Sequence, residues 1–223
     1  MGSDKALLQV DDLECVRDGR VLFRQLQLRL DPGQVVSLEG ANGAGKSTLL
    51  RCIAGLYPDY SGEITSAPLL YCGHKPGMCG QLSTLENLEF LSRIDARGAA
   101  HSNVGLDKAD ESSLIEALET VGLEGYESVR CASLSAGQLR RVGLARLLVS
   151  RAPVWLLDEP LTALDKSGAR LLGRVLSHHV ERGGSAVCAT HQALPFDNCI
   201  TLDLASVAAA DTSAEAGGPG LGP

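Results

Sequence analysis

The sequence is poor in aromatic residues, since Phe, Tyr and Trp together make up 4% of its 223 residues. So few rings make a base-stacking surface for single-stranded nucleic acid unexpected. None of the seven cysteines forms a C-x-x-C pair, which argues against a zinc ribbon, a thioredoxin-type motif and a covalent haem attachment site. There is no run of 18 apolar residues, so we expect no membrane-spanning helix. The N-terminal segment carries early charges and does not resemble a signal peptide.

Basic charge is also in the minority, because 20 Lys and Arg residues stand against 27 Asp and Glu residues, for a net charge of −7. This balance gives no general attraction to nucleic acid or to anionic lipid. The 44% apolar and 21% charged content is ordinary for a globular protein, and the length suits one large domain or a core with a small subdomain. The odd number of widely spaced cysteines indicates a reducing compartment. We therefore expect a cytosolic domain.

Short apolar runs typical of buried parallel strands alternate along the chain with segments of helical spacing. The expected strands cover residues 35–38, 69–72, 154–157, 185–189 and 199–204. The expected helices cover residues 45–54, 85–94, 114–121, 139–149 and 169–180. This alternation predicts an α/β fold with a mainly parallel sheet.

The middle of the chain departs from the alternation. From about residue 86 to residue 150 the pattern is helical without a convincing strand, which predicts an inserted α-helical subdomain. Within it, residues 95–111 are polar and are predicted to form a loop. The whole domain is expected to span residues 5–204. The Ala/Gly/Pro-rich remainder, residues 205–223, lacks bulky apolar side chains and is predicted to be a disordered tail.

The clearest motif is G-A-N-G-A-G-K-S at residues 40–47, which fits G-x-x-x-x-G-K-[ST] and lies between an expected strand and an expected helix. In such a loop the backbone N–H groups and the positive end of the helix bind phosphates. Lys46 is predicted to reach the β- and γ-phosphates, and the Ser47 hydroxyl to ligate Mg²⁺. The residues predicted to surround the nucleotide phosphates are Gly40, Ala41, Asn42, Gly43, Ala44, Gly45, Lys46, Ser47 and Thr48.

Two adjacent carboxylates, Asp158 and Glu159, directly follow the expected strand at residues 154–157. Asp158 is predicted to hold Mg²⁺, and Glu159 to polarise the water that attacks the phosphate. The alternative is that the pair is simply the polar exit of a buried strand.

A third segment, L-S-A-G-Q at residues 134–138, precedes an amphipathic helix. Ser135 and Gln138 have capping-box spacing, so the segment could be no more than a well-capped helix start. The functional interpretation is that Ser135, the Gly137 amide and the helix dipole face a γ-phosphate.

Taken together, these segments resemble the nucleotide-binding subunits of ABC transporters, which have a P-loop NTPase (ABC ATPase) core, over about residues 6–204. The resemblance makes residues 40–47 the Walker A loop, 134–138 the signature, 158–159 the end of Walker B and 163–165 the D-loop. It implies that His191 contacts the γ-phosphate and orients Glu159, and that catalysis depends on Lys46, Glu159 and His191. It also implies a homodimer in which each ATP is held between the Walker A loop of one copy and the signature, including Gln138, of the other. Asp165 would cross the dimer interface, although it could equally be a helix cap.

Two positions differ from the family pattern. The aromatic residue that usually stacks on adenine is missing, and Arg17 is the nearest candidate to stack through its guanidinium group. The glutamine of the Q-loop is replaced by His74. A histidine there could meet Mg²⁺-bound water or transmit to a membrane partner, or it could be a plain loop residue.

Residues 17–23, 73–77, 85–88, 134–141 and 158–166 are similar to those of ATP-binding subunits that serve cytochrome c maturation. This narrower resemblance implies an ATPase at the cytoplasmic face of the bacterial inner membrane, docked on an integral-membrane subunit similar to CcmB. Its turnover would be coupled to haem export or to release of a haem-loaded chaperone, with haem-handling membrane proteins as indirect partners and no nucleic acid. The alternatives are a subunit of another ABC exporter, for lipid or lipoprotein, a non-transport ABC assembly ATPase, and a P-loop kinase.

Overall fold

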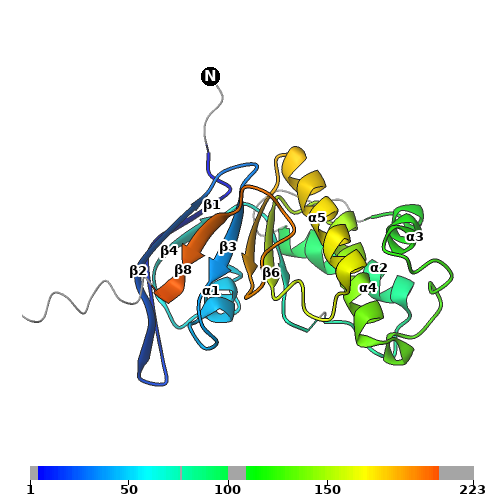
Figure 1. Ribbon diagram of the computed structural model, residues 1–223, viewed down its shortest axis with the longest axis horizontal. Coiled ribbons are helices and arrows are strands. Elements are labelled where there is room, and N and C mark those ends of the chain that lie inside the picture. Colours follow the sequence, from blue (N-terminus) through cyan, green and yellow to red (C-terminus); the bar gives the residue numbers. More distant parts are fainter. Residues whose placement is uncertain (1–4, 76, 100–108, 206–223) are drawn as a thin grey trace, which may run out of the picture.

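A five-stranded parallel sheet forms the centre of the protein in the computed structural model, which describes residues 5–75, 77–99 and 109–205 (Figure 1). Its strands lie in the order β5-β6-β7-β3-β8. Their bounds are β3 Val35–Glu39, β5 Leu69–Cys72, β6 Val154–Asp158, β7 Ser185–Ala189 and β8 Ile200–Asp203. All five strands predicted from the sequence are therefore present, with ends shifted by one residue at most.

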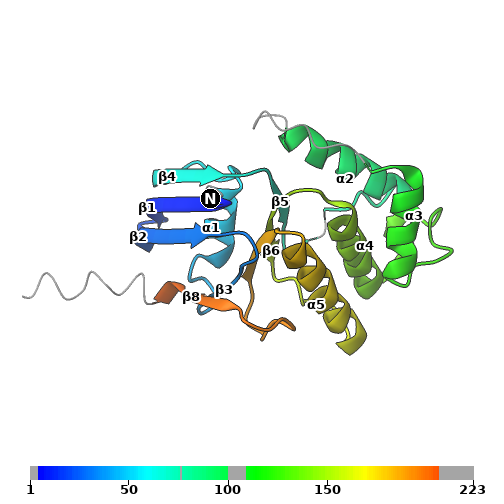
Figure 2. The same ribbon diagram turned by 90° about the horizontal axis from the view of Figure 1, so that it is seen from above.

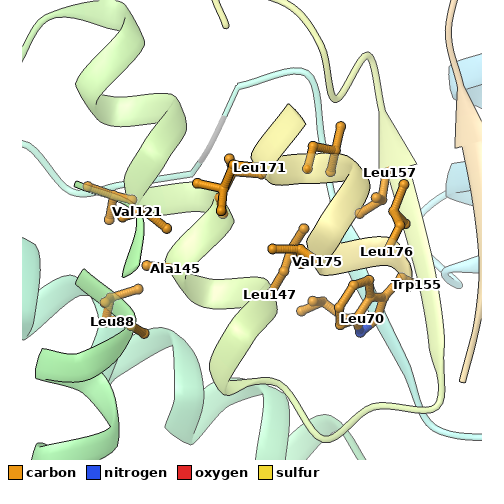
Figure 3. Close-up of a cluster of buried hydrophobic side chains, with 14 of the residues drawn as sticks. Leu70, Leu88, Val121, Ala145, Leu147, Trp155, Leu157, Leu171, Val175 and Leu176 are labelled. Atoms are coloured by element: carbon orange, nitrogen blue, oxygen red, sulfur yellow. The ribbon is translucent and has the colours of Figure 1, made fainter. Parts of the chain in front are cut away.

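The central strands are apolar throughout because both faces of the sheet are covered. Successive side chains of a strand point to opposite faces. In β6, Trp155 and Leu157 belong to one buried cluster, whereas Leu156 belongs to the other. Figure 3 shows the first cluster, in which Trp155 and Leu157 pack with residues such as Leu147 and Val175 of the neighbouring helices. Two-sided burial thus explains why these strands read as continuous hydrophobic runs.

A second sheet, antiparallel and three-stranded, was not predicted from the sequence. It contains β1 Leu8–Arg17, β2 Arg20–Leu30 and β4 Ser61–Ser66 in the order β2-β1-β4. A sequence signal was present: Leu26, Leu28 and Leu30 are buried while the residues between them are exposed, the alternation of a half-buried strand. Asp18 and Gly19, both with positive φ, form the two-residue turn between β1 and β2.

The helices occupy two places. Helix α1, Lys46–Ile53, lies beside the antiparallel sheet, and α5, Lys166–Glu181, packs against the parallel sheet (Figure 2). Helices α2 Thr84–Ala99, α3 Glu111–Thr120 and α4 Ala136–Val149 contact one another at the end of the molecule opposite the antiparallel sheet. A short 3₁₀ turn, Cys131–Ser133, precedes α4. Within the described residues, none of the helices has the length and apolar character needed to cross a membrane.

The loop predicted over residues 95–111 is wrong at both of its ends. Helix α2 continues through Ala99, and α3 begins at Glu111. The polar residues of α2 are stabilised by partners: Asp95 forms a half-buried ion pair with Arg146 of α4 at 2.7 Å, and Glu89 pairs with Arg93 one turn later. The remainder of that predicted loop, residues 100–108, and residues 206–223 of the predicted disordered tail lie outside the described residues.

Candidate functional site

Three of the predicted motifs meet at one edge of the parallel sheet. Strand β7 pairs with β6 on one side and β3 on the other, all in parallel, so their carboxyl ends lie together. The loop at residues 40–47 follows β3, Asp158 and Glu159 stand at the end of β6, and His191 follows β7. The carboxyl edge of such a sheet is where α/β proteins commonly bind ligands.

The phosphate loop has the backbone that its glycines allow. Gly45 has φ of 101°, a region that other residues avoid, and a Cβ added there would lie only 3.1 Å from Leu22 Cβ. Gly45 is also the N-cap of α1, and it offers no side chain to the first-turn N–H groups of the helix. These donors and the positive helix end are therefore directed toward the loop, as an anion site requires.

The Lys46 side chain points back into the curve of the loop. Only 7% of the residue is exposed, and its Nζ donates to the carbonyl oxygens of Gly40 at 2.5 Å and Ala41 at 3.2 Å. The ammonium group is thus held at the centre of the ring of loop residues rather than extended into solvent.

Ser47 and Asp158 are in direct contact although 111 residues separate them. The Ser47 hydroxyl donates to Asp158 Oδ1 at 2.9 Å. Asp158 is 2% exposed, and its Oδ2 has no hydrogen-bond partner within the described part of the chain. A buried carboxylate oxygen without a partner is costly. The combination of a hydroxyl and an unsatisfied carboxylate fits the oxygen ligands that Mg²⁺ takes in proteins.

Glu159 and His191 form the other contact across the site. His191 Nδ1 lies 2.9 Å from Glu159 Oε2, with the glutamate side chain 17% exposed and the histidine 57% exposed. The turn that carries His191 is fixed by Thr190, whose Oγ1 accepts from the Gln192 N–H at 3.0 Å. The structure therefore brings together the two residues that the resemblance paired.

A cavity of about 630 Å³ opens over the phosphate loop. Residues 41–48 and Glu159 line it, together with Arg17, Asp18, Arg20 and Leu22 from the β1–β2 hairpin. Arg17, predicted from the sequence, is thus at the cavity. Arg20, its cross-strand partner, was missed, although the hairpin turn signal at Asp18-Gly19 would have placed the two arginines side by side.

The residues of the signature segment do not line this cavity. Ser135 Oγ accepts from the Gln138 N–H, and Gln138 Oε1 accepts from the Ser135 N–H, so both bonds of the predicted capping box are present. Gly137 lies in the first turn of α4. Within one chain, the segment is therefore a capped helix start at a distance from the phosphate loop's cavity.

Asp165 caps α5, as one of the two sequence interpretations anticipated. Its carboxylate accepts from the Gly168 N–H at 2.7 Å and from the Ser167 hydroxyl at 3.0 Å. The backbone bond from Gly168 and the bond from Ser167 hold the pKa of Asp165 below its usual value. Asp165 does not line the cavity over the phosphate loop.

His74 is exposed, and it contacts α4 through its main chain rather than through its ring. Its carbonyl oxygen accepts from Arg140 Nη1 at 3.4 Å. Arg140 itself was missed by sequence reasoning, because neither its spacing nor its neighbours distinguish it from the arginine that follows. Its burial and its contacts exist only in the tertiary structure.

This arrangement can bind a chain of phosphates with a metal ion and can place a carboxylate and an imidazole beside the terminal phosphate. Comparisons with known proteins identify the family of the chain. The family profile described as ABC transporter matches residues 23–162. The chain is 45% identical over 202 residues to the cytochrome c biogenesis ATP-binding export protein CcmA of Tatumella citrea, covering 85% of this chain and 90% of that protein.

Solved structures give the same fold. The chain is similar to a putative ABC transporter ATP-binding protein from Pyrococcus furiosus, with a TM-score of 0.73 and 23% identity over 90% of this chain and 98% of that one. It is also similar to a dimeric ATP-binding cassette in a post-hydrolysis state bound to ADP and Pi, with a TM-score of 0.70 and 23% identity over 83% of this chain and 88% of that one.

Proposed function

The chain belongs to the ABC transporter family of ATP-binding proteins, and we propose that it is the ATP-hydrolysing subunit of a membrane complex for cytochrome c maturation. The assignment to cytochrome c maturation rests on one observation. The chain is 45% identical to a relative named as a cytochrome c biogenesis ATP-binding export protein, and the match covers 90% of that relative's length. The observation that supports hydrolysis is the contact between Glu159 and His191 beside the phosphate loop.

The reaction is the attack of water on the γ-phosphorus of ATP. The bond between that phosphorus and the β–γ bridging oxygen breaks, ADP leaves, and the water supplies the new oxygen of inorganic phosphate. Glu159 is the group that orients the water and accepts its proton, while His191 holds the Glu159 carboxylate and reaches the γ-phosphate. Lys46 and the loop N–H groups bind the β- and γ-phosphates and stabilise the charge that develops there.

The donors around Asp158 fit Mg²⁺. Ser47 Oγ and the Asp158 carboxylate are the groups of this chain that would hold the ion, Asp158 either directly or through water. Binding of the cation would satisfy Asp158 Oδ2, which has no hydrogen-bond partner among the described residues. When bound, Mg²⁺ neutralises part of the charge on the β- and γ-phosphates.

A second copy of the chain supplies the groups that the cavity over the phosphate loop lacks. Ser135, the Gly137 amide and Gln138 stand outside that cavity in their own chain, so in a head-to-tail pair they are free to face the γ-phosphate bound by the other copy. Asp165 then lies toward the interface between the copies. The dimeric cassette bound to ADP and Pi, which has the same fold, supports such a pair.

The complex requires a membrane partner. We place the chain at the cytoplasmic face of the bacterial inner membrane, docked on an integral-membrane subunit similar to CcmB, with haem-handling proteins as indirect partners. ATP binding closes the dimer, hydrolysis reopens it, and the movement is passed to the membrane subunit. His74, exposed on the loop after β5, is a candidate for that contact.

The test uses Glu159→Gln with Glu181→Gln, an exposed α5 residue, as the matched control. We expect Glu159→Gln to bind ATP, to lose at least 100-fold in phosphate release, and to accumulate as a closed dimer with ATP and Mg²⁺ in light scattering. Wild-type turnover in this variant would contradict the role of Glu159. A monomer under these conditions, alone and with the membrane subunit, would contradict the shared site.

The client is tested separately, in cells. Expression of the chain in a bacterium that lacks its own CcmA should restore covalently haem-stained c-type cytochromes, and the Glu159→Gln variant should not. If the active chain copurifies with a different membrane exporter and restores no cytochrome, its client is another substrate, such as a lipid or lipoprotein. A complex without any membrane subunit would support an assembly ATPase.

A further inference from the structure

Arg140, in the second turn of α4, binds three main-chain carbonyl groups from two other parts of the chain. Its Nε donates to the Pro160 oxygen at 3.2 Å, its Nη1 donates to the His74 oxygen at 3.4 Å, and its Nη2 donates to the Glu159 oxygen. The guanidinium group thus joins α4 to the loop after β5 and to the turn after β6.

Helix packing alone does not require a cation at this position. Arg140 is 8% exposed, and within the described residues no carboxylate lies within 4 Å of it. Burial lowers its pKa, while nearby Asp158 and Glu159 act in the opposite direction. A buried charge is tolerated only when it is hydrogen-bonded, and here three carbonyl oxygens accept from three of the five guanidinium N–H groups. A methionine would fill similar space without that cost.

The carbonyl group of Glu159 belongs to a constrained piece of backbone. Glu159 has φ of 52°, in the left-handed region that residues other than glycine seldom adopt. Its N–H donates to the Ala189 oxygen at 2.8 Å, and its carbonyl accepts from the Thr162 N–H at 3.2 Å as well as from Arg140. Both peptide groups of Glu159 are therefore held, one by β7 and the other by Arg140 and Thr162.

We propose that Arg140 is a positioning residue for Glu159, which fixes the Glu159–Pro160 carbonyl groups to α4 and so aims the Glu159 carboxylate at His191 and the γ-phosphate. Because Ser135 caps the same helix, a shift of α4 as a second copy approaches Ser135 also moves the peptide that carries Glu159. The orientation of the carboxylate is thereby tied to the position of the signature segment. This inference rests on the proposed hydrolysis at Glu159.

The experiment compares two arginines of the same helix in the purified chain. Arg140→Lys keeps the charge but cannot reach three carbonyl groups at once, because one ammonium group replaces the planar fork. Arg146→Lys is the matched control: Arg146 also lies on α4, but it pairs with Asp95 and contacts neither Glu159 nor His74. Arg140→Met serves as a stronger variant, and each protein is checked for cooperative thermal unfolding.

We expect Arg140→Lys to lower kcat for ATP about 10-fold with KM changed less than 3-fold, and Arg146→Lys to leave kcat within 2-fold. Arg140→Met should lower kcat further, and if it does not fold, Arg140→Lys decides alone. In a Glu159→Gln background, measured by single-turnover phosphate release, Arg140→Lys should cost less than 2-fold, because there is no carboxylate left to aim.

The inference would be overturned if Arg140→Lys lowered the hydrolysis rate equally in the wild-type and Glu159→Gln backgrounds. It would also be overturned if Arg146→Lys lowered kcat as much as Arg140→Lys does. These outcomes differ from failure of the proposed function, in which Glu159→Gln itself keeps its turnover. If Glu159→Gln is inactive but Arg140→Lys keeps the wild-type kcat, the proposed hydrolysis stands and only the role of Arg140 is removed.

Discussion

His191 Nδ1 lies 2.9 Å from Glu159 Oε2, and the two residues come from the ends of neighbouring parallel strands. This close approach places an imidazole against a carboxylate that stands beside the phosphate loop. His191 Nδ1 faces the glutamate, and the other ring nitrogen, Nε2, lies 3.4 Å from Gln192 Nε2.

For His191 we expect the alanine variant to lower kcat about 100-fold, because the carboxylate loses its orienting partner and the γ-phosphate loses a contact. The KM for ATP should change less than about 3-fold, since the loop N–H groups and Lys46 still bind the phosphates. Steady-state phosphate release measures both constants. His178→Ala, an exposed change on α5, is the control, and an equal effect in both variants would argue against a specific role.

For Lys46 the methionine variant should bind ATP about 10- to 100-fold more weakly, because a charge-assisted bond from a side chain that is itself almost buried to the phosphates is lost. Isothermal calorimetry with the non-hydrolysing Glu159→Gln background gives the affinity directly. Lys5→Met, at an exposed position, should bind as the parent does. Unchanged affinity in the Lys46 variant would remove the phosphate-loop assignment.

For Arg17 the alanine variant should weaken ATP binding about 3- to 10-fold, as expected for the loss of a guanidinium group stacked on the base. Binding of inorganic tripolyphosphate should be less affected, because tripolyphosphate has no base. Arg17→Tyr should keep the affinity for ATP, since a ring can stack in the same place. If ATP and tripolyphosphate lose affinity equally, Arg17 is a phosphate contact instead.

His179 predicts a specific pH dependence of stability. Its ring stacks on Trp155, with ring centroids 3.6 Å apart and planes 7° apart, and burial lowers its pKa to about 4. In the unfolded chain the pKa returns to about 6.5, so acid favours the unfolded state. The His179 contribution is complete above pH 6.5 and is lost as the pH falls toward 4.

The loss should amount to about 1–3 kcal/mol, because each pKa unit is worth about 1.4 kcal/mol and partial exposure reduces the total. Urea unfolding at pH 7 and pH 5 measures it. His179→Phe keeps a ring against Trp155 and should show a smaller decrease between the two pH values than the wild type does. Identical decreases would show that other groups account for the acid sensitivity.

Local sequence signals were sufficient for the elements that carry the site. The apolar runs of β3, β6 and β7 and the glycines of the phosphate loop are recognisable because each reflects a local constraint: burial on both faces in the strands, or a positive φ as at Gly45. The antiparallel sheet was missed although its alternation is equally local, because bulges in β1 break the pattern between Val10 and Val16. The loop prediction over residues 95–111 failed at its start for a different reason. Asp95 is helical and pairs with Arg146, which is 51 residues away in the sequence and therefore gives no local signal.

The sequence by itself determined which chemical groups the protein has for binding phosphates and for activating the water that attacks them. It could do so because each motif is a short stretch whose backbone geometry follows from its own residues. Only the tertiary structure decided which of those groups meet. The order β6-β7-β3 brings Ser47 to Asp158 and Glu159 to His191, and the folding of α4 against the end of β6 buries Arg140 among three carbonyl groups. Such contacts join residues that are distant in the chain, and their geometry is set by packing of the whole core.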